Sequence, residues 1–271
     1  MKLQDKLQAY RGKGKAILAT NFYNLETLKG ILSAVKAVHV PIILQLSKSS
    51  IDYIGLEIAV NMAKSALKEF DVEGWVHLDH GNSPELARRC LEAGFDSVMI
   101  DASEKSFQEN VDITSEVVEA AKKYGAHVEA ELGYVAKLGQ SQGNHVFTQP
   151  DDAARFVQMT GVHSLAVAIG SAHGFYKDPP NLQIDLLDEI RRATPATLVL
   201  HGSSGIPDEM LRRAVTHGIT KINLATEIKD TFMKSLRHLL ETSSEIDLRK
   251  VFPPAIQSVT ELIQSKLTVL I

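Results

Sequence analysis

Eight short apolar segments rich in β-branched residues recur along the chain, and their spacing constrains the fold more than any other feature. Amphipathic segments separate them, with apolar residues at intervals of three and four, the period of a helix that buries one face. Strands that alternate with helices in this way favour a parallel sheet covered by helices. The eight predicted strands are residues 16–21, 41–47, 75–80, 97–101, 127–133, 164–170, 197–202 and 221–226.

Two architectures accommodate this alternation, a closed (β/α)8 barrel and an open doubly wound sheet. The count of eight favours the barrel, and so does the lack of a G-x-G-x-x-G motif after the first strand. A chain of 271 residues with no break in composition is the size of one such barrel. We therefore predict an α/β TIM barrel that forms a single domain over residues 1–271, with two extra C-terminal helices within roughly 227–271.

Local signals refine this arrangement. Ser83 and Pro84 are typical of a helix cap followed by the first helical residue, and Gly94 stands where that helix is expected to end. Two polar segments, 48–54 and 134–150, are predicted to be longer loops after strands, where barrel enzymes keep mobile functional parts.

Charge and cysteine content indicate the compartment and the classes of partner. The net charge of −4 and the lack of a Lys/Arg block argue against a nucleic-acid-binding surface. The stretch MKLQDKLQAYRGKGK has charges where a signal peptide needs an apolar run, and no apolar run approaches the roughly 20 residues of a membrane span. The single cysteine, Cys90, is expected to be a buried thiol. We expect a cytoplasmic protein with no nucleic-acid or membrane partner.

Polar side chains gather at the carboxyl ends of the predicted strands, which in a barrel surround one pocket. Histidines follow strands three, six and seven, and carboxylates end strands three, four and five. Three histidines with an open fourth position are a catalytic zinc arrangement, so the set predicts a metal site with carboxylates beside it. The strand-end residues are Asn21, Ser47, Asp79, His80, Asp101, Glu131, His173, His201, Asn223 and Thr226.

Taken singly, each of these residues has a plain structural interpretation. A lone histidine at a strand end is a hydrogen-bonded structural residue about four times in five. Asp101 can be a helix cap, and Glu129 and Glu131 share one face of a strand, where either can form a structural pair. His77, three residues before His80, is interpreted as structural. The metal interpretation rests on three histidines at three separate strand ends.

Glycine and hydroxyl residues after the last three strands predict a phosphate site. Gly174 follows His173, HGSSG follows strand seven, and NLAT lies at the end of strand eight. Barrels frequently hold a phosphate in these loops through backbone N–H groups and a helix N-terminus, although HGSSG alone is equally typical of an ordinary turn.

A Schiff-base aldolase needs a lysine near the inner end of a strand, whereas Lys221 begins strand eight. Metal-assisted carbonyl chemistry on a sugar phosphate is therefore favoured.

The segments HLDHG, SVMIDAS, VEAELG, SLAVAIGSAHGFY, LVLHGSSGIP and GITKINLATE closely resemble the class II, zinc-dependent ketose-bisphosphate aldolases. This family includes fructose- and tagatose-bisphosphate aldolases, and the similarity runs in order from about residue 4 to the C-terminus. The resemblance implies a zinc-dependent aldolase that reversibly cleaves a ketose phosphate into dihydroxyacetone phosphate and an aldehyde through a metal-stabilised enediolate.

The resemblance also implies roles for the residues of the metal site. The zinc ligands correspond to His80, His173 and His201. Asp79 matches the aspartate that moves a proton on the C4 hydroxyl of the ketose. Asp101 and Glu131 match carboxylates that support the metal site or hold a second metal.

Further matches concern the substrate and the assembly. Arg249 matches an arginine that reaches into a neighbouring subunit's pocket and binds the second phosphate, which implies a homodimer or homotetramer; Leu248 stands where the family usually has proline. A monovalent cation, Na⁺ or K⁺, is implied near the first phosphate. The cradle for the phosphate of the dihydroxyacetone phosphate half corresponds to Gly174, Gly202, Ser204 and Thr226, with Asn223 beside its hydroxyl and carbonyl and Asn21 and Ser47 in the pocket.

One segment departs from the family pattern. After ELG the bisphosphate aldolases usually continue with Gly-Gly and an acidic pair on a mobile loop, one of whose carboxylates handles the C3 proton. Here YVAKLGQSQGN follows, and no Asp or Glu lies between Tyr134 and Pro150. Three explanations stay open: another acid–base group, with His145 the best titratable candidate; a different substrate; or loss of this step.

The alternative to an enzyme is a non-catalytic, aldolase-like subunit that binds a sugar phosphate or supports a partner enzyme. Retention of Asp79 and of all three histidines favours the enzyme. Fructose 1,6-bisphosphate, tagatose 1,6-bisphosphate and related sugar phosphates stay open as substrates.

Overall fold

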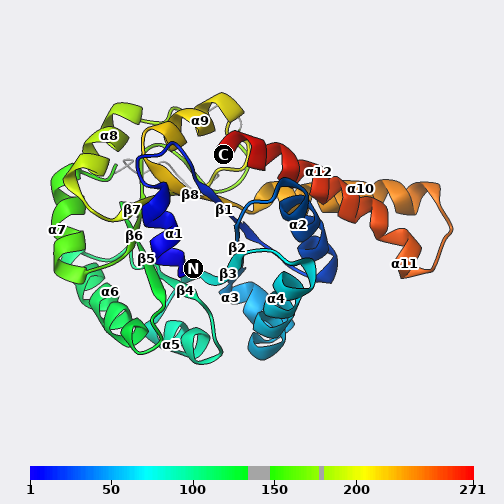
Figure 1. The fold of residues 1–271 in the computed structure, drawn as a ribbon, viewed down its shortest axis with the longest axis horizontal. Coiled ribbons are helices and arrows are strands. Elements are labelled where there is room, and N and C mark those ends of the chain that lie inside the picture. Colours follow the sequence, from blue (N-terminus) through cyan, green and yellow to red (C-terminus); the bar gives the residue numbers. More distant parts are fainter. Residues whose placement is uncertain (134–146, 177–179) are drawn as a thin grey trace.

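The computed structural model describes residues 1–133, 147–176 and 180–271. Eight parallel strands close into a barrel in which each strand pairs with its neighbours in sequence and β8 pairs with β1, so the predicted barrel is confirmed (Figure 1). The strands are β1 (Ile17–Asn21), β2 (Ile42–Ser47), β3 (Gly74–Gly81), β4 (Ser97–Ile100), β5 (His127–Leu132), β6 (Ser164–Val167), β7 (Thr197–Leu200) and β8 (Ile219–Leu224).

Helices surround the barrel and bury their apolar faces against the strands. One of them, α5, begins as predicted: the Ser83 hydroxyl accepts a hydrogen bond from the Leu86 N–H, and Pro84 is the first helical residue. Beyond its end Gly94 adopts a φ of 97°, which favours glycine. The surrounding helices are α2 (Leu25–Val38), α3 (Lys48–Ile54), α4 (Leu56–Phe70), α5 (Pro84–Glu92), α6 (Phe107–Lys122), α7 (Pro150–Thr160), α8 (Ile184–Ala193) and α9 (Asp208–Thr216).

A further helix, α1 (Leu3–Tyr10), lies across the N-terminal end of the barrel (Figure 1). The Trp75 indole N–H donates to the Met1 carbonyl over 3.2 Å, which ties this end to β3. Because α1 covers the amino ends of the strands, the face formed by their carboxyl ends is the open one. Its apolar side forms one buried cluster with strand residues: Leu3, Leu7, Ile17, Ala19, Ile43 and Trp75.

The prediction of a loop at residues 48–54 is wrong, because these residues form α3. The Ser47 side chain caps the helix by accepting a hydrogen bond from the Ser50 N–H, and Ile51 is buried in the core. A single apolar anchor in a polar segment gives too little periodicity to indicate a helix. In the second predicted loop, residues 134–146 lie outside the described part of the chain.

The C-terminal part forms α10 (Thr226–Thr242), α11 (Leu248–Val251) and α12 (Pro253–Leu270). The two predicted extra helices are therefore present, and the segment expected to connect them contains the short α11 as a third. The outer ends of α10 and α12, with α11 between them, project away from the barrel and are called the arm below (Figure 1). The inner part of α12 packs on α2 at Gly30, where an added Cβ would lie 2.8 Å from a Val259 methyl carbon, so the two helices approach too closely for a side chain.

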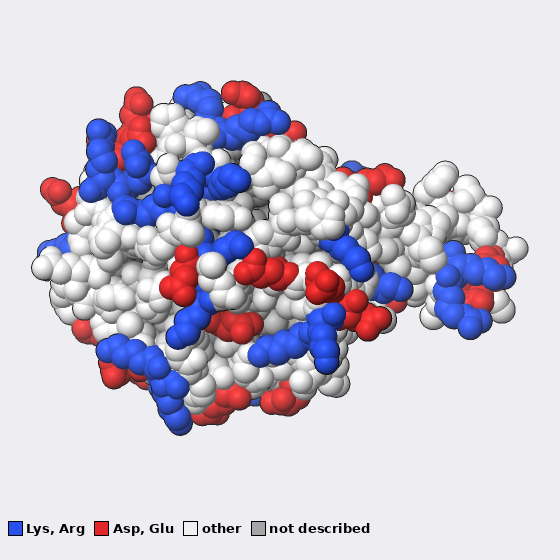
Figure 2. Space-filling model, viewed as in Figure 1, with Lys and Arg blue, Asp and Glu red and all other residues white. Residues whose placement is uncertain are grey.

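Among the described residues, no helix combines the length and the apolar character needed to cross a bilayer. Basic and acidic side chains are interspersed over the face seen in Figure 2. The tip of the arm carries its own ion pairs, Arg249 with Asp247 at 2.9 Å and Lys250 with Glu245 at 3.1 Å.

Candidate active site at the carboxyl ends of the strands

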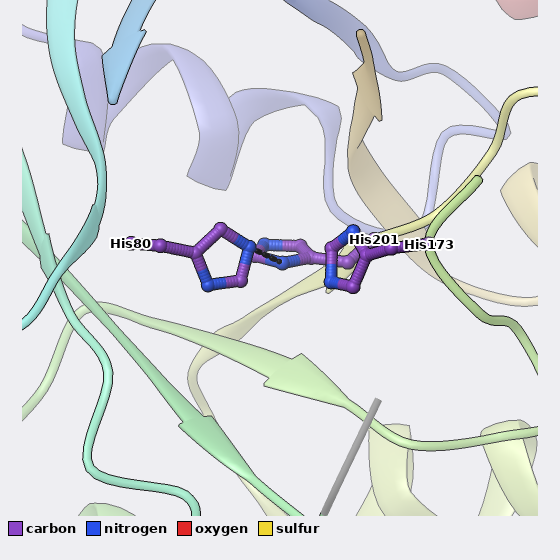
Figure 3. Close-up of side chains that lie close together, drawn as sticks. All are labelled: His80, His173 and His201. Carbon is purple, nitrogen blue, oxygen red and sulfur yellow. Dashed lines mark hydrogen bonds between the residues drawn. The ribbon is translucent and has the colours of Figure 1, made fainter. Parts of the chain in front are cut away.

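Three histidine rings converge at the open face of the barrel (Figure 3). His80 ends β3, His173 lies in the loop after β6, and His201 follows β7 directly. The ring centroids are 5.0 Å apart for His80 and His173, 4.7 Å for His80 and His201, and 5.9 Å for His173 and His201. One nitrogen from each ring lies within 4.8 Å of the others. The convergence expected from the strand ends is therefore present.

His80 is aimed at this centre by a local irregularity of the backbone. Its φ is 49°, in the left-handed region, and the register between β3 and β4 shifts between Leu78 and Gly81. The Nδ1 atom of His80 then lies 2.7 Å from Asp101 Oδ2. Asp101 is itself held by the Ser103 N–H at 3.2 Å and the Ser103 hydroxyl at 2.8 Å.

Electrostatics favour the charged forms of this pair. Burial alone would lower the pKa of His80, but Asp79 and the hydrogen bond with Asp101 outweigh it and raise the pKa to about 9. Burial would raise the pKa of Asp101, but the contacts with His80 and Ser103 hold that pKa well below its ordinary value. Asp101 is therefore an ionised acceptor for the Nδ1–H of His80.

His201 is held from the interior of the barrel. Its Nε2 atom lies 2.9 Å from Glu129 Oε1, and the other oxygen of Glu129 accepts a hydrogen bond from Lys221 Nζ at 2.7 Å. Burial would raise the pKa of Glu129, but Lys221 outweighs it and keeps that pKa low. Burial, together with the charges of His80 and Lys221, lowers the pKa of His201 well below its usual value. The ring is therefore neutral near pH 7 and keeps a lone pair for a metal.

The inner nitrogens of two rings face each other: His80 Nε2 lies 3.0 Å from His201 Nδ1. The other nitrogens, Nδ1 of His80 and Nε2 of His201, each face an ionised carboxylate, which can only accept a hydrogen bond. Two inner lone pairs at this separation need a proton or a metal cation between them. With His173 as the third imidazole, the donor set fits a zinc-type divalent ion and leaves a position for substrate.

Glu131 extends this donor set. Its Oε2 atom lies 3.5 Å from His201 Nδ1. Glu131, His80 and Asp101 form a second group that brings one possible ligand atom from each within 4.8 Å.

Asp79 lies beside the histidines and is almost fully buried, with 8% of its surface exposed. Its Oδ2 atom accepts from Asn21 Nδ2 at 2.9 Å, and its Oδ1 atom accepts from Asn223 Nδ2 at 3.4 Å. The distance from Asp79 Oδ1 to His80 Nε2 is 4.0 Å. Burial would raise the pKa of Asp79, but the nearby His80 and His201 and the Asn21 hydrogen bond lower it. An ionised carboxylate at this position can accept a proton from a bound hydroxyl.

Several of these groups line one cavity of about 720 Å³. The predicted residues that reach its wall are Asn21, Ser47, Asp79, His80, Asp101, Glu131, His173, Gly174 and Thr226. Lys229 and Tyr23, which sequence reasoning missed, line it as well, with the Lys229 ammonium 5.4 Å from the centroid of the Tyr23 ring. Lys229 comes three residues after Thr226 in α10, which is the spacing of one helix face.

The predicted phosphate residues lie in adjoining loops that pack tightly. Gly202 has a φ of 67°, and an added Cβ there would lie 2.3 Å from the Ala172 carbonyl oxygen. The Tyr176 hydroxyl donates to the Gly202 carbonyl over 2.8 Å and accepts from the Ala172 N–H over 2.6 Å, so it joins the two loops. The Ser204 hydroxyl accepts from the Glu227 N–H over 3.3 Å, in the first turn of α10.

Among the described residues, Arg249 is not brought to this cavity, and the other predicted residues that do not line it are His201, Gly202, Ser204 and Asn223. Arg249 lies on the arm with 90% of its side chain exposed. His145 lies outside the described residues. His77 is fully buried, and its Nδ1 atom lies 2.7 Å from the Ser97 hydroxyl, as its structural interpretation requires.

Comparison with known proteins agrees with this geometry. The family described as fructose-bisphosphate aldolase class-II matches residues 1–271.

The chain belongs to this family.

The class II aldolase is therefore a carbon–carbon lyase. It is similar to a fructose-bisphosphate aldolase of Geobacillus stearothermophilus, with 40% identity over 96% of this chain and 92% of the relative. A fructose-bisphosphate aldolase of Helicobacter pylori is 34% identical over 97% of this chain and 95% of the relative. Among solved structures, the YdjI aldolase of Escherichia coli K12 superposes with a TM-score of 0.89 at 32% identity, covering 99% of this chain and 96% of that one.

Proposed function

We propose that this class II aldolase is zinc-dependent and reversibly cleaves a ketose phosphate into dihydroxyacetone phosphate and an aldehyde. Fructose 1,6-bisphosphate, tagatose 1,6-bisphosphate and related sugar phosphates are the candidate substrates. The observation that carries the proposal is the meeting of three histidine rings beside an ionised Asp79, with His80, His173 and Asp79 lining one cavity. The alternative of a non-catalytic subunit is not favoured, since the family and the named relatives are aldolases.

His80, His173 and His201 would hold the zinc ion, with Asp101 orienting the His80 ring. Bound zinc supplies a Lewis acid that stabilises negative charge on substrate oxygens during carbon–carbon cleavage. Glu131 would support this site or take part in a second metal position with Asp101 and His80.

Asp79 would remove the proton from the C4 hydroxyl during cleavage and return it during condensation. Asn21 and Asn223 donate hydrogen bonds to its two oxygens, so they fix the direction of the carboxylate. Asn223 would contact the dihydroxyacetone phosphate half as well. The group that handles the C3 proton stays a proposal, with His145 as the candidate.

Gly174, Gly202, Ser204 and Thr226 would bind the phosphate of the dihydroxyacetone phosphate half, with Na⁺ or K⁺ nearby. The start of α10 at Thr226 supports this assignment, because helix N-termini present free backbone N–H groups to anions. Asn21 and Ser47 would contact the remainder of the sugar. The Lys229 ammonium, which lines the same cavity, would attract the second phosphate or another acidic group.

We further propose a homodimer or homotetramer in which Arg249 serves the pocket of a neighbouring subunit. The arm points away from its own barrel and exposes apolar side chains, with exposed fractions of 61% for Leu240, 91% for Ile246 and 60% for Leu248. Exposed apolar groups of this kind are typical of a protein interface. A single domain and a cytoplasmic location, as expected from the sequence, complete the proposal.

A cleavage screen tests this function. The protein is incubated with ketose mono- and bisphosphates, with zinc or after exhaustive chelation, and dihydroxyacetone phosphate release is measured. We expect zinc-dependent release from at least one substrate and no enzyme trapping by borohydride. Activity that persists after complete metal removal, or release from none of the substrates, contradicts the proposal.

A further inference from the structure

The ion pair between Lys221 and Glu129 crosses the interior of the barrel. Lys221 lies on β8 and Glu129 on β5, and these strands are not neighbours in the sheet. The two side chains are 1% and 0% exposed, and the distance from Nζ to Oε2 is 2.7 Å. A buried ion pair of this kind is weak evidence for a role in stability, because desolvation of the two charges offsets their attraction. The reason for its presence therefore lies outside stability.

The geometry of Glu129 supplies that reason. One carboxylate oxygen is engaged by Lys221, and the other lies 2.9 Å from Nε2 of His201. An ionised carboxylate accepts hydrogen bonds and cannot donate them, so the proton of the neutral His201 ring is placed on Nε2. Its lone pair is then on Nδ1, the atom that faces His80 Nε2 at 3.0 Å.

His80, at the rim of the site, is held in the same way as His201. Asp101 contacts Nδ1 of His80 at 2.7 Å and is itself held by Ser103. At the rim a hydroxyl and a backbone N–H fix the carboxylate of Asp101, whereas in the buried interior the ammonium of Lys221 fixes that of Glu129. The two carboxylates approach their rings from opposite sides of the histidine pair.

We propose that Glu129 and Lys221 are positioning residues that set the tautomer of His201 and keep its Nδ1 available to the metal. Lys221 fixes the position of the Glu129 carboxylate, and this carboxylate fixes the His201 ring. Neither residue lines the substrate cavity, so both act through His201. This inference rests on the proposed metal site.

The test uses the double variant Glu129→Gln/Lys221→Met, which removes both buried charges while keeping similar side-chain volumes. Buried ion pairs are often replaced in this way without loss of folding. The glutamine can either accept from or donate to the ring, so both tautomers become populated. In chelated protein labelled with ¹⁵N-histidine, we expect a protonated Nδ1 signal of His201 to appear, assigned by comparison with a His201→Gln variant. Zinc affinity, measured by chelator competition, is expected to fall about 10- to 100-fold.

The matched control is His77→Gln. His77 Nε2 lies 3.4 Å from Lys221 Nζ and 3.9 Å from Glu129 Oε2, so this variant perturbs the surroundings of the ion pair but keeps both of its charges, and His77 has no hydrogen bond with His201. We expect its zinc affinity and its His201 tautomer to match those of the natural protein. If the double variant does not fold, Glu129→Asp is used instead. This variant shortens the side chain and keeps the two charges balanced, and it is expected to weaken zinc binding in the same way.

An unchanged His201 spectrum in the folded variants overturns the inference, even if zinc binding weakens, because the loss then does not pass through the tautomer. Unchanged zinc affinity overturns it too. The tautomer is read without metal or substrate, so a natural protein that binds no zinc would refute the proposed function separately.

Discussion

His80 and His201 approach each other through nitrogen atoms, with Nε2 of the first 3.0 Å from Nδ1 of the second, while carboxylates contact both outer nitrogens. The space between the inner nitrogens suits one cation. A proton and a metal ion therefore compete for the same pair of atoms.

This competition predicts a pH-dependent metal affinity. In metal-free protein the pKa of His80 is raised to about 9, so the ring is protonated at pH 7 and must release its proton to bind metal. We expect zinc affinity to rise about tenfold per pH unit between pH 7 and 9, with close to one proton released. Calorimetry in buffers of different ionisation enthalpy measures the proton count. Affinity that is constant over this range would show that His80 is not a ligand.

The same shift predicts how the metal-free protein responds to pH. Because the folded-state pKa of His80 lies above the ordinary 6.5, its stabilising contribution is complete below about pH 6.5 and is lost as pH rises through about 9. We expect the free energy of unfolding to fall across this window by up to about 3 kcal/mol. Asp101→Asn, which removes a carboxylate beside the ring, should flatten the slope. Denaturant melts at several pH values measure both proteins.

Replacing Asp79 by Ala should remove turnover and leave zinc bound. The variant deletes the proposed base but none of the three imidazoles, so a loss of about 10²- to 10⁴-fold in kcat is expected. Zinc content per subunit and thermal stability serve as controls on the same preparation. A kcat close to that of the natural protein would exclude Asp79 from proton transfer.

Tyr176→Phe should loosen the phosphate loops. The hydroxyl joins the Ala172 N–H to the Gly202 carbonyl, and its removal leaves both groups without this partner, at a cost of about 1–3 kcal/mol in stability. We expect a higher KM, with a smaller change in kcat, since the metal ligands and Asp79 are untouched. Tyr124→Phe, on the partly exposed Tyr124, is the control and should change neither constant. Equal KM values for the two variants would contradict the proposed role of the loops.

Mixing two defective variants tests whether Arg249 acts between subunits. Asp79→Ala lacks the base but supplies Arg249, and Arg249→Ala lacks the arginine but keeps Asp79. If Arg249 serves a neighbour, mixed assemblies contain one complete pocket, and activity should recover after the two proteins are unfolded and refolded together. Each variant refolded alone is the control. No gain over the sum of the two controls would place Arg249 outside the neighbour's pocket.

The sequence predicts the barrel well because every strand carries its own apolar signal, and the order of strands in a (β/α)8 fold follows the chain. It predicts the rim residues for the same reason, since the carboxyl ends of parallel strands meet at one face. His80 and His201 are 121 residues apart in sequence, yet the topology alone brings them together. The sequence does not predict α3 at residues 48–54 or α1, because short helices anchored by one or two apolar side chains have little periodicity.

The interior of the barrel was harder to predict. From the sequence, Lys221 is a residue at the wrong end of β8 for Schiff-base chemistry, and Glu129 shares a strand face with Glu131. Their contact spans 92 residues and crosses the barrel, and no local pattern encodes it. The alternation of Lys221 with Asn223 on β8 does place both side chains on one face of the strand, and that is the signal that was available.

The carboxylates of Asp101 and Glu129 orient two histidines through contacts that belong wholly to the protein. Folding and metal acquisition can then be separate events, with the metal added late to a finished scaffold. A cell could exchange zinc for another divalent ion in the folded enzyme, and the supply of ions, more than the folding pathway, would determine which metal the enzyme carries.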